Sequence, residues 1–308
     1  MIRVRDLRVD YDNFCAVGDV SLHVGEGEVC GLIGPNGAGK TTTMRAMLGL
    51  IEPTYGEVEM AGVDMRERPR DACRLLGFMP DNPPMYEDLK CWEFLDLFAA
   101  SYDIPKKNRP KVVGEHLELV GLSAKRDAMV VELSRGMRQR LMLAKTLIPD
   151  PKVLLLDEPA SGIDPQGRID LKNILKDLAA RGKTVLVSSH ILTEMQEFCT
   201  SVAIMEKGRM VESGEIGAVN LRVLGAAEMM VEVLGSADAF FRIVTEDPLA
   251  ASILQKDNVY GFRYAGTSDE AAVLLAKLIH AGVRVASFAP RKEGLEDLFL
   301  KIGAKELS

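Results

Sequence analysis

The sequence predicts an α/β protein in which a mostly parallel sheet carries an antiparallel β segment and a helical insert, followed by a small C-terminal α+β domain. Three observations support this prediction. An apolar strand runs into a glycine-rich turn and a helix near residue 34; two apolar strands flank a helix over residues 152–190; and strand and helix patterns resume after residue 220. A chain of 308 residues has room for about two domains.

The first 62 residues have the pattern of short strands joined by tight turns. IRVRDLRV and VSLHV alternate in polarity, whereas EVCGLIG is a continuous apolar run, as expected for a strand buried on both faces. A helix is predicted from about Gly39 to Leu50, and EVEMAG is a further strand. The alternating segments therefore predict the antiparallel part, and EVCGLIG predicts the first central strand.

Residues 82–147 have a different character and predict the helical insert. YEDLKCWEFLDLFAASYDI, KVVGEHLELVGL and LSRGMRQRLMLAKTLI each have amphipathic helical spacing. Strand patterns return with KVLLLDEP and KTVLVSSH, which are separated by the helix QGRIDLKNILKDLAARG. This βαβ order indicates a parallel sheet and gives one domain over residues 1–220.

Residues 221–308 predict the second, smaller domain. EMMVEVLG, NVYGFRYAG and VRVASFAP have strand patterns. The expected helices are ADAFFRIVTEDPLAASIL, SDEAAVLLAKLIHAG and the terminal EGLEDLFLKIGAKEL. In the terminal helix an apolar stripe recurs at helical spacing, which favours packing into the core over a partner groove. The segment shows no catalytic or metal-binding cluster of His, Cys or acidic residues.

Composition restricts the classes of partner. The net charge of −7 disfavours a surface built for nucleic acid, which usually needs a dominant basic field. No segment approaches the roughly 20 apolar residues of a membrane span, and the N-terminus is charged where a signal peptide is apolar. Five cysteines without a CxxC pair are typical of reduced thiols. We therefore expect a cytoplasmic chain that reaches a membrane only through a partner.

The segment Gly34-Pro-Asn-Gly-Ala-Gly-Lys-Thr41 fits the phosphate-binding pattern GxxxxGK[ST] and lies between a strand and a helix, as that pattern requires. Its backbone N–H groups and the helix N-terminus would surround phosphate oxygens. Lys40 would reach the terminal phosphates, and the Thr41 hydroxyl would ligate Mg²⁺. The structural alternative is a glycine-rich turn with a solvated lysine.

KVLLLDEP supplies two carboxylates at the end of a buried strand. In open α/β sheets the carboxyl ends of the strands form the ligand-binding edge. Asp157 would orient Mg²⁺ through water, and Glu158 would polarise the water that attacks the terminal phosphate. The alternative is that both acids cap the following loop.

Taken in order, GPNGAGKTT, LSRGMRQR, LLLDEP, SGIDP and SSH resemble the ATP-binding subunit of an ABC transporter over residues 1–220. The resemblance implies a P-loop NTPase fold and the cofactors ATP and Mg²⁺. Implied catalytic residues are Lys40, Glu158 and His190, and implied metal-binding residues are Thr41, Asp157 and Asp81. Implied nucleotide contacts are Tyr11, Gly34, Pro35, Asn36, Gly37, Ala38, Gly39, Lys40, Thr41, Thr42, Ser134, Arg135, Gly136 and Asp164.

The resemblance also implies that two chains pair head to tail, with ATP between the phosphate loop of one and LSRGM of the other. Arginines in the first turn of a helix face its positive end, where cations are disfavoured. The phosphates of ATP held by a second chain would provide negative charge near these arginines and make their position more favourable. The alternative is that Ser134 is an ordinary N-cap and the arginines are solvated.

Two positions depart from the family pattern. Arg135 replaces the first glycine of the usual LSGGQ signature, and Asp81 replaces the usual glutamine of the Q-loop. Aspartate is shorter and anionic, so the favoured role is a contact with the metal through a bridging water, and the alternative is a loop cap. For Tyr11 and His190 the alternatives to adenine stacking and a γ-phosphate contact are ordinary structural roles.

The favoured function is an ATP-hydrolysing motor subunit that works with a second copy and an integral membrane subunit. The C-terminal segment resembles the extension found in multidrug, antibiotic or lipid exporters, which favours export. One alternative is a soluble ATPase of the same fold that acts on nucleic acid or ribosomes, but tandem units and long coiled-coil inserts are not visible. The other alternative is a small-molecule kinase with the same phosphate loop, but that function does not explain the LSRGM segment.

Overall fold

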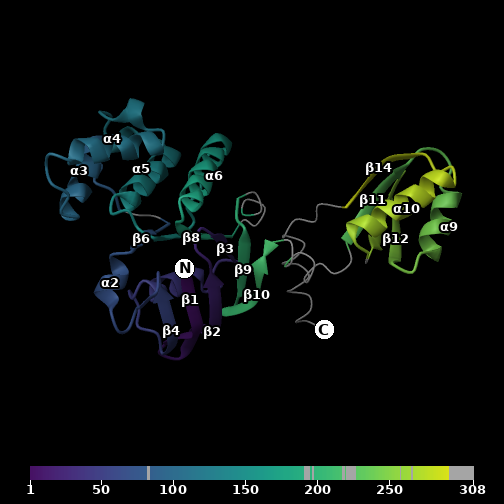
Figure 1. Ribbon diagram of the computed structural model, residues 1–308, viewed down its shortest axis with the longest axis horizontal. Helices are drawn as coiled ribbons and strands as arrows, with labels where there is room; N and C mark the ends of the chain where they lie inside the picture. The colour runs from purple at the N-terminus through teal and green to yellow at the C-terminus, as the bar shows by residue number, and fades with distance from the viewer. Residues whose placement is uncertain are drawn as a thin grey trace. The chain divides into compact units, whose positions relative to one another are not determined.

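The computed structural model describes residues 1–81, 84–190, 195, 198–216, 219, 227–256, 258–264 and 266–290. The chain divides into two compact units, Met1–Ile216 and Gly217–Ser308, whose elements are labelled in Figure 1. In the described ranges no helix is both long enough and apolar enough to cross a membrane.

The first unit is built on a six-stranded sheet. Its strands, in order across the sheet, are β10 (Arg209–Glu215), β9 (Ser201–Glu206), β3 (Val29–Ile33), β8 (Thr184–Ser189), β7 (Val153–Leu156) and β6 (Leu76–Met79). β9, β3, β8, β7 and β6 are parallel, and β10 is antiparallel to β9. Every residue of β3, β7 and β8 is buried, as the continuous apolar runs predict. The prediction of a mostly parallel sheet is confirmed.

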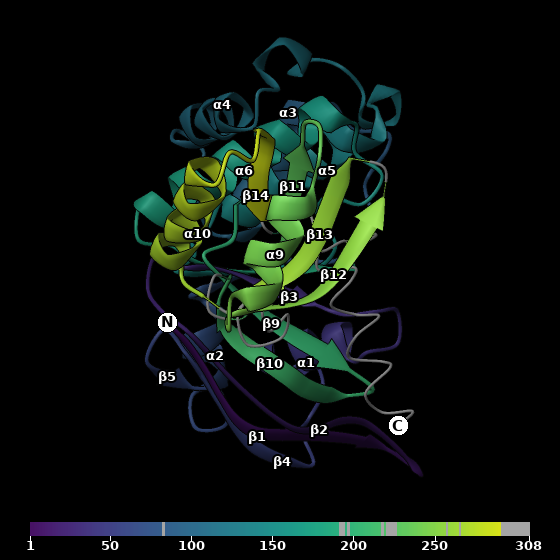
Figure 2. The same cartoon turned by 90° about the vertical axis from the view of Figure 1, so that its right-hand side faces the viewer.

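A second, antiparallel sheet lies against the first through a shared core. Its strands, in order, are β2 (Phe14–Val24), β1 (Ile2–Tyr11), β4 (Tyr55–Met60) and β5 (Val63–Asp64). Their inward side chains pack with helix α1 (Lys40–Met47) and with one face of the central sheet in a single cluster. Figure 2 shows β1, β2 and β4 below the central strands and helix α6 (Pro165–Ala180) above them.

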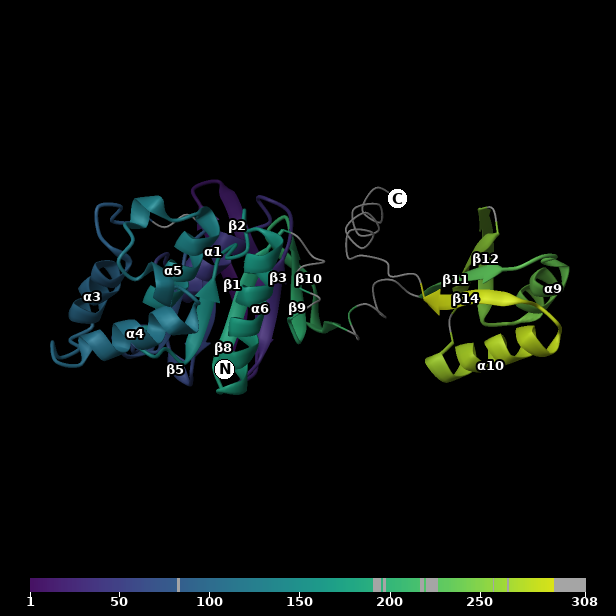
Figure 3. The same cartoon turned by 90° about the horizontal axis from the view of Figure 1, so that it is seen from above.

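The helical insert is confirmed. It contains α3 (Cys91–Ser101), α4 (Arg109–Leu119) and α5 (Arg135–Leu147), which gather at one end of the unit in Figure 3. Two short 3₁₀ turns, Ser123–Lys125 and Val130–Glu132, precede α5. A short helix, α2 (Pro69–Cys73), lies outside the insert.

The second unit has the order β11, α9, β12, β13, α10, β14. The bounds are β11 (Ala227–Val233), α9 (Asp238–Glu246), β12 (Ala250–Lys256), β13 (Val259–Tyr264), α10 (Ser268–His280) and β14 (Val285–Pro290). The strands form one antiparallel sheet in the order β12-β13-β11-β14. Phe240, Phe262 and Leu278 are among the residues of its separate core.

The prediction of one helix in this unit is correct for its first half and wrong for its second half. Residues 237–254 were predicted as a single helix, but α9 ends at Glu246 and β12 begins at Ala250. Pro248 explains the break, because proline disfavours helical backbone at the preceding residue, and Asp247 is indeed extended. The predicted terminal helix, with its apolar stripe, lies outside the described residues.

Candidate functional site

The turn between β3 and α1 is shaped by close backbone packing. A Cβ at Gly34 would lie 2.3 Å from the Met205 carbonyl oxygen. Gly39 has a φ of +98°, and a Cβ there would lie 2.8 Å from the Ala16 carbonyl oxygen. These two positions therefore require glycine, and the loop they form places Lys40 at the first residue of α1.

Lys40 is folded back onto this loop. Its side chain is almost fully buried, and Nζ donates to the carbonyl oxygens of Gly34 at 2.7 Å and Pro35 at 3.2 Å. Glu158 Oε1 lies 3.7 Å from Nζ. Burial lowers the pKa of Lys40, and the nearby carboxylates of Glu158 and Asp157 oppose that shift. The site thus holds a lysine that an anion would further stabilise as a cation.

Asp157 lies at the end of β7 and joins three elements. Its Oδ2 accepts from the Thr41 hydroxyl at 2.8 Å, and its Oδ1 accepts from the Ser188 hydroxyl. The Ser188 oxygen in turn accepts from the Glu158 backbone N–H at 2.9 Å. Asp157 is 3% exposed, so these bonds fix a buried carboxylate beside the first turn of α1.

Glu158 and His190 form a second polar pair at the same edge of the sheet. A hydrogen bond of 2.8 Å joins Glu158 Oε2 to His190 Nδ1. Glu158 has a left-handed backbone with a φ of +48°, which turns its side chain away from that of Asp157. One carboxylate oxygen of Glu158 thus lies toward Lys40, and the other is bonded to His190.

Lys40, Asp157 and Glu158 line an open cleft of about 390 Å³, whereas His190 is not among its described lining residues. Its lining residues are Tyr11, Phe14, Ala16, Asn36, Gly37, Ala38, Gly39, Lys40, Thr41, Thr42, Asp81, Asp157 and Glu158. Tyr11 and Phe14 pair across the β1–β2 turn, and both rings are largely exposed. The cleft therefore has a phosphate-binding end and an aromatic end.

The LSRGM segment lies elsewhere in the unit. Ser134, Arg135 and Gly136 are absent from the described lining of the cleft. Ser134 is the N-cap of α5, and its Oγ accepts from the Met137 N–H at 3.3 Å. Asp164 likewise caps α6 by accepting from the Gly167 N–H at 3.2 Å. Ser134 is therefore engaged in capping α5 and is not among the described residues that line the cleft.

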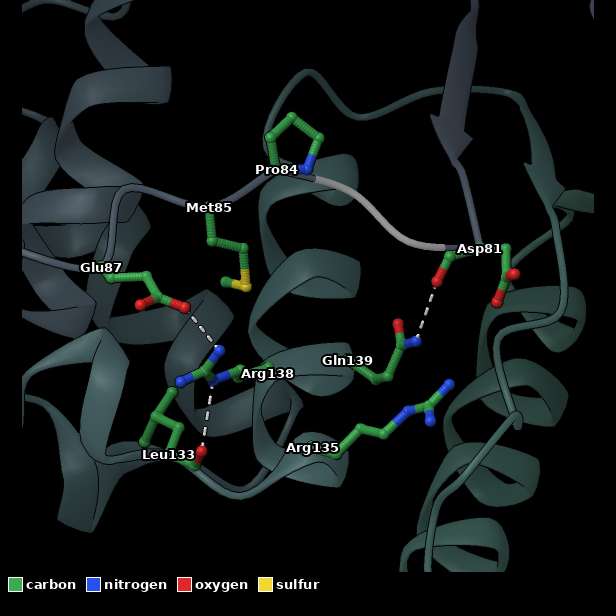
Figure 4. Close-up of a pocket in the computed structure, with 8 residues that line it drawn as sticks. All are labelled: Asp81, Pro84, Met85, Glu87, Leu133, Arg135, Arg138 and Gln139. Atoms are coloured by element: carbon green, nitrogen blue, oxygen red, sulfur yellow. Dashed lines mark hydrogen bonds and ion pairs between the residues drawn. The ribbon is translucent and has the colours of Figure 1, made fainter.

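Asp81 connects the cleft to a groove of about 630 Å³, shown in Figure 4. The groove is lined by Asp81, Pro84, Met85, Glu87, Leu133, Arg135, Arg138 and Gln139. Gln139 Nε2 donates to the Asp81 carbonyl oxygen at 3.3 Å, and Arg138 pairs with Glu87 at 2.7 Å. Two residues of α5 are thus bonded to the chain at Asp81 and at Glu87, and both of these positions line the groove.

Comparison with known proteins shows the family to which this chain belongs. A family model described as ABC transporter matches residues 17–161. The chain is 33% identical to the uncharacterized ABC transporter ATP-binding protein YxlF of Bacillus subtilis, over 98% of this chain and 99% of that protein. It is 34% identical to the Nod factor export ATP-binding protein I of Burkholderia pseudomallei, over 96% and 95%.

This chain belongs to the ATP-binding subunits of ABC transporters. A solved ATP-binding subunit of an ABC transporter superposes with a TM-score of 0.65 at 29% identity, over 72% of this chain and 92% of that one. A dimeric bacterial ABC transporter cassette superposes with a TM-score of 0.64 at 25% identity, over 70% and 99%. This ABC ATPase therefore binds ATP, whose hydrolysis drives transport.

Some functional residues were not predicted from the sequence of this ABC ATPase. Phe14 lines the cleft beside Tyr11, and the available signal was its place opposite Tyr11 across a two-residue turn. Ser188 holds Asp157 and the Glu158 backbone, but a serine within an apolar strand gives no such signal. Gln139 is buried against Asp81, and only the fold brings them together.

Proposed function

We propose that this subunit powers an exporter whose membrane part is a separate polypeptide. The export direction is supported by the similarity to Nod factor export proteins over almost the whole of both chains. The separate membrane part is supported by relatives that match this chain over nearly their full length and are named ATP-binding proteins. The subunit would work at the inner face of the cell membrane.

We further propose that two copies close head to tail over two ATP molecules. The observation that carries this proposal is the separation of two half-sites in one chain. Lys40, Thr41 and Asp157 line the cleft, whereas Ser134 caps a helix outside the cleft's described lining. The N-terminus of α5 has backbone N–H groups available for a phosphate held by the other copy. That one solved relative is a dimer of cassettes agrees with this arrangement.

The protein groups near Thr41 fit a magnesium ion. The Thr41 hydroxyl and the Asp157 carboxylate are hard oxygen donors 2.8 Å apart, and both line the cleft. Among the described residues no group of three or more His, Cys, Asp or Glu could hold a metal by itself, so ATP and water would supply the other ligands. When bound, the ion would neutralise charge on the phosphates. Asp81 would contact it through water.

Each remaining residue then has a role in hydrolysis. Lys40 and the backbone of the 34–39 turn bind the phosphates, and Tyr11 stacks on adenine. Glu158 accepts a proton from the attacking water, and His190 orients its carboxylate through the 2.8 Å hydrogen bond. Most of the rate gain would come from positioning and electrostatics. The groove of Figure 4, beside Asp81, would receive a helix of the membrane subunit.

Complementation between two inactive chains tests the shared site. Ser134→Arg should block hydrolysis, while the isolated chain still binds ATP through its intact cleft. Lys40→Ala should also be inactive. A mixed dimer has one intact composite site, made from Lys40 of the first chain and Ser134 of the second, so phosphate release should return. If mixing restores no hydrolysis while both variants still fold, the head-to-tail site is wrong.

The membrane partner is tested separately. A tagged chain carrying Glu158→Gln should be purified from its native membrane in the presence of ATP. An integral membrane protein of the exporter type should copurify, and transport by that membrane protein reconstituted with the unsubstituted chain should require ATP on the side of this subunit. Recovery of a ribosome or a nucleic acid instead would favour the soluble ATPase alternative.

A further inference from the structure

Arg135, the residue that departs from the family's usual glycine, contacts a loop of its own chain. We define the 159–164 loop as the segment between Glu158 and α6. Arg135 Nη2 donates to Ser161 Oγ at 3.3 Å. Its guanidinium also covers Gly162, because a Cβ at Gly162 would lie 2.6 Å from both Cζ and Nε of Arg135. The arginine therefore fills the space that a side chain at residue 162 would occupy.

The same loop is held to the start of α5 by apolar packing. Ile163 is almost fully buried, and a Cβ at Gly136 would lie 3.2 Å from its Cγ2. On the other side, a Cβ at Gly167 in α6 would lie 2.3 Å from that atom. Two glycines thus let Ile163 sit between α5 and α6. Arg135 and Gly136 together fix the loop against the helix that Ser134 caps.

The 159–164 loop leads directly to Glu158. The Ser161 backbone N–H donates to the Glu158 carbonyl oxygen at 3.0 Å. Glu158 itself depends on an unusual backbone, with a φ of +48°, to direct its side chain toward Lys40 and His190. Any shift of Ser161 is therefore transmitted to the backbone that aims this carboxylate.

Charge pairing does not account for the position of Arg135. Within the described residues Arg135 forms no ion pair, and its side chain donates a hydrogen bond to the neutral Ser161 hydroxyl. By contrast, Arg138 and Arg140 of the same helix pair with Glu87 and Asp170. Arg135 is also the first residue of α5, where a cation is disfavoured. The contact between Arg135 and the 159–164 loop is the interaction that offsets the unfavourable placement of a cation at the start of α5.

We propose that Arg135 is a positioning residue that fixes the 159–164 loop and, through it, Glu158 of the same chain. The proposal rests on the shared site proposed above. In that dimer, Ser134 and Gly136 serve the nucleotide of the partner copy, while Arg135, next to both, controls the hydrolytic carboxylate of its own nucleotide. The first turn of α5 thereby couples the two ATP sites.

Mixed dimers separate this role from a direct contact with the partner's phosphates. In the first arrangement an Arg135→Ala chain is paired with a Lys40→Ala chain, so that the one working phosphate loop belongs to the arginine variant and its Ser134 partner is unchanged. In the second, Arg135→Ala and Lys40→Ala are on one chain and the partner is unsubstituted. Both are isolated through two different tags and compared with an unsubstituted/Lys40→Ala reference dimer.

The first arrangement should lose about tenfold in kcat, because misplacing a catalytic group by a fraction of an ångström has effects of this order. Its KM for ATP should change less than about twofold, because the cleft is intact. The second arrangement should match the reference dimer. Loss in the second arrangement, or none in the first, overturns the proposal.

Further variants show whether Ser161 carries the effect. Ser161→Ala should lower kcat in the first arrangement, and adding it to Arg135→Ala should give little further loss, since both remove the same contact. Arg135→Lys should fail to restore kcat, because a lysine lacks the planar group that covers Gly162. Arg126→Ala, an arginine of the helical insert that packs over Trp92, is the matched control. An inactive reference dimer would instead indicate failure of the shared site.

Discussion

Glu158 shows how a single residue joins backbone geometry to chemistry. Its left-handed φ of +48° costs about 1–3 kcal/mol for a residue without a glycine's freedom. That backbone is held by the Ser188 hydroxyl and by the Ser161 N–H, and it separates the Glu158 side chain from that of its neighbour Asp157. Adjacent carboxylates thus receive different partners, with Thr41 on Asp157 and His190 on Glu158.

We predict that Glu158→Gln binds ATP with nearly unchanged affinity but hydrolyses it about 10²–10⁴ times more slowly, because an amide cannot accept the proton. The ATP-bound dimer should accumulate and be visible by size-exclusion chromatography, while phosphate release measures turnover. Glu52→Gln, at an exposed position, is the control. Unchanged turnover in Glu158→Gln would remove this residue from the mechanism.

Sequence reasoning at this scale worked best for motif residues. The phosphate loop follows a spacing rule, so Lys40 and Thr41 were expected to lie beside the carboxylates of KVLLLDEP, and they contact Glu158 and Asp157 respectively. Phe14 and Ser188 were missed because neither belongs to a spacing rule. Their roles depend on which residue lies opposite them, across a turn or between neighbouring strands.

At the scale of elements, helix α5 carries two kinds of function. Its first turn contributes Ser134, Arg135 and Gly136, while its later turns pack into the insert. Lys145, near its end, is largely buried with its Nζ 4.9 Å from the centre of the Phe98 ring of α3. No ion pair of Lys145 is found among the described residues. This contact makes the α3–α5 packing sensitive to pH.

Burial lowers the pKa of Lys145 below its ordinary value of 10.5. The folded chain therefore binds fewer protons at this site than the unfolded chain, between the folded-state pKa and 10.5. Burying the charged Lys145 side chain lowers the free energy of unfolding, and this cost is fully present below the folded-state pKa. The cost falls as the pH rises from the folded-state pKa to 10.5.

We predict that Lys145→Met raises the Tm by about 2 °C near pH 7, because it removes this penalty while keeping an unbranched side chain. The Tm should be measured by thermal unfolding at pH 7 and at pH 9.5. Between these two values of pH, the Tm of Lys145→Met should rise less than the Tm of the unsubstituted chain. Lys111→Met, at an exposed position, should change neither value. A fall in Tm for Lys145→Met would show that the contact with Phe98 dominates.

The whole molecule consists of two units, each with a separate core. In the C-terminal unit, Phe240 is fully buried and its ring contacts those of Phe241, Tyr260 and Phe262. The described residues that line the cleft beside Lys40 all belong to the first unit. We therefore expect the stability of the second unit to be separable from ATP binding.

We predict that Phe240→Ala destabilises the C-terminal unit by about 3–5 kcal/mol, as expected for a fully buried phenylalanine. Denaturant unfolding should show an earlier transition for this unit, and ATP binding by the first unit should be unchanged. Val273→Ala, an exposed position of α10, is the control. A parallel loss of ATP affinity would show that the two units fold as one.

The sequence alone was sufficient for the α/β class, the helical insert, the phosphate loop and the family resemblance, because these depend on local periodicity and on residues at short, fixed spacings. It did not show where α9 ends, since apolar spacing continues past Pro248. Nor did it show that Arg135 lies over Gly162 or that Ser188 holds Asp157 and Glu158. Only the tertiary structure decided these points, because each depends on the distance between segments that are far apart along the chain and are brought together, or kept apart, by sheet order and helix packing.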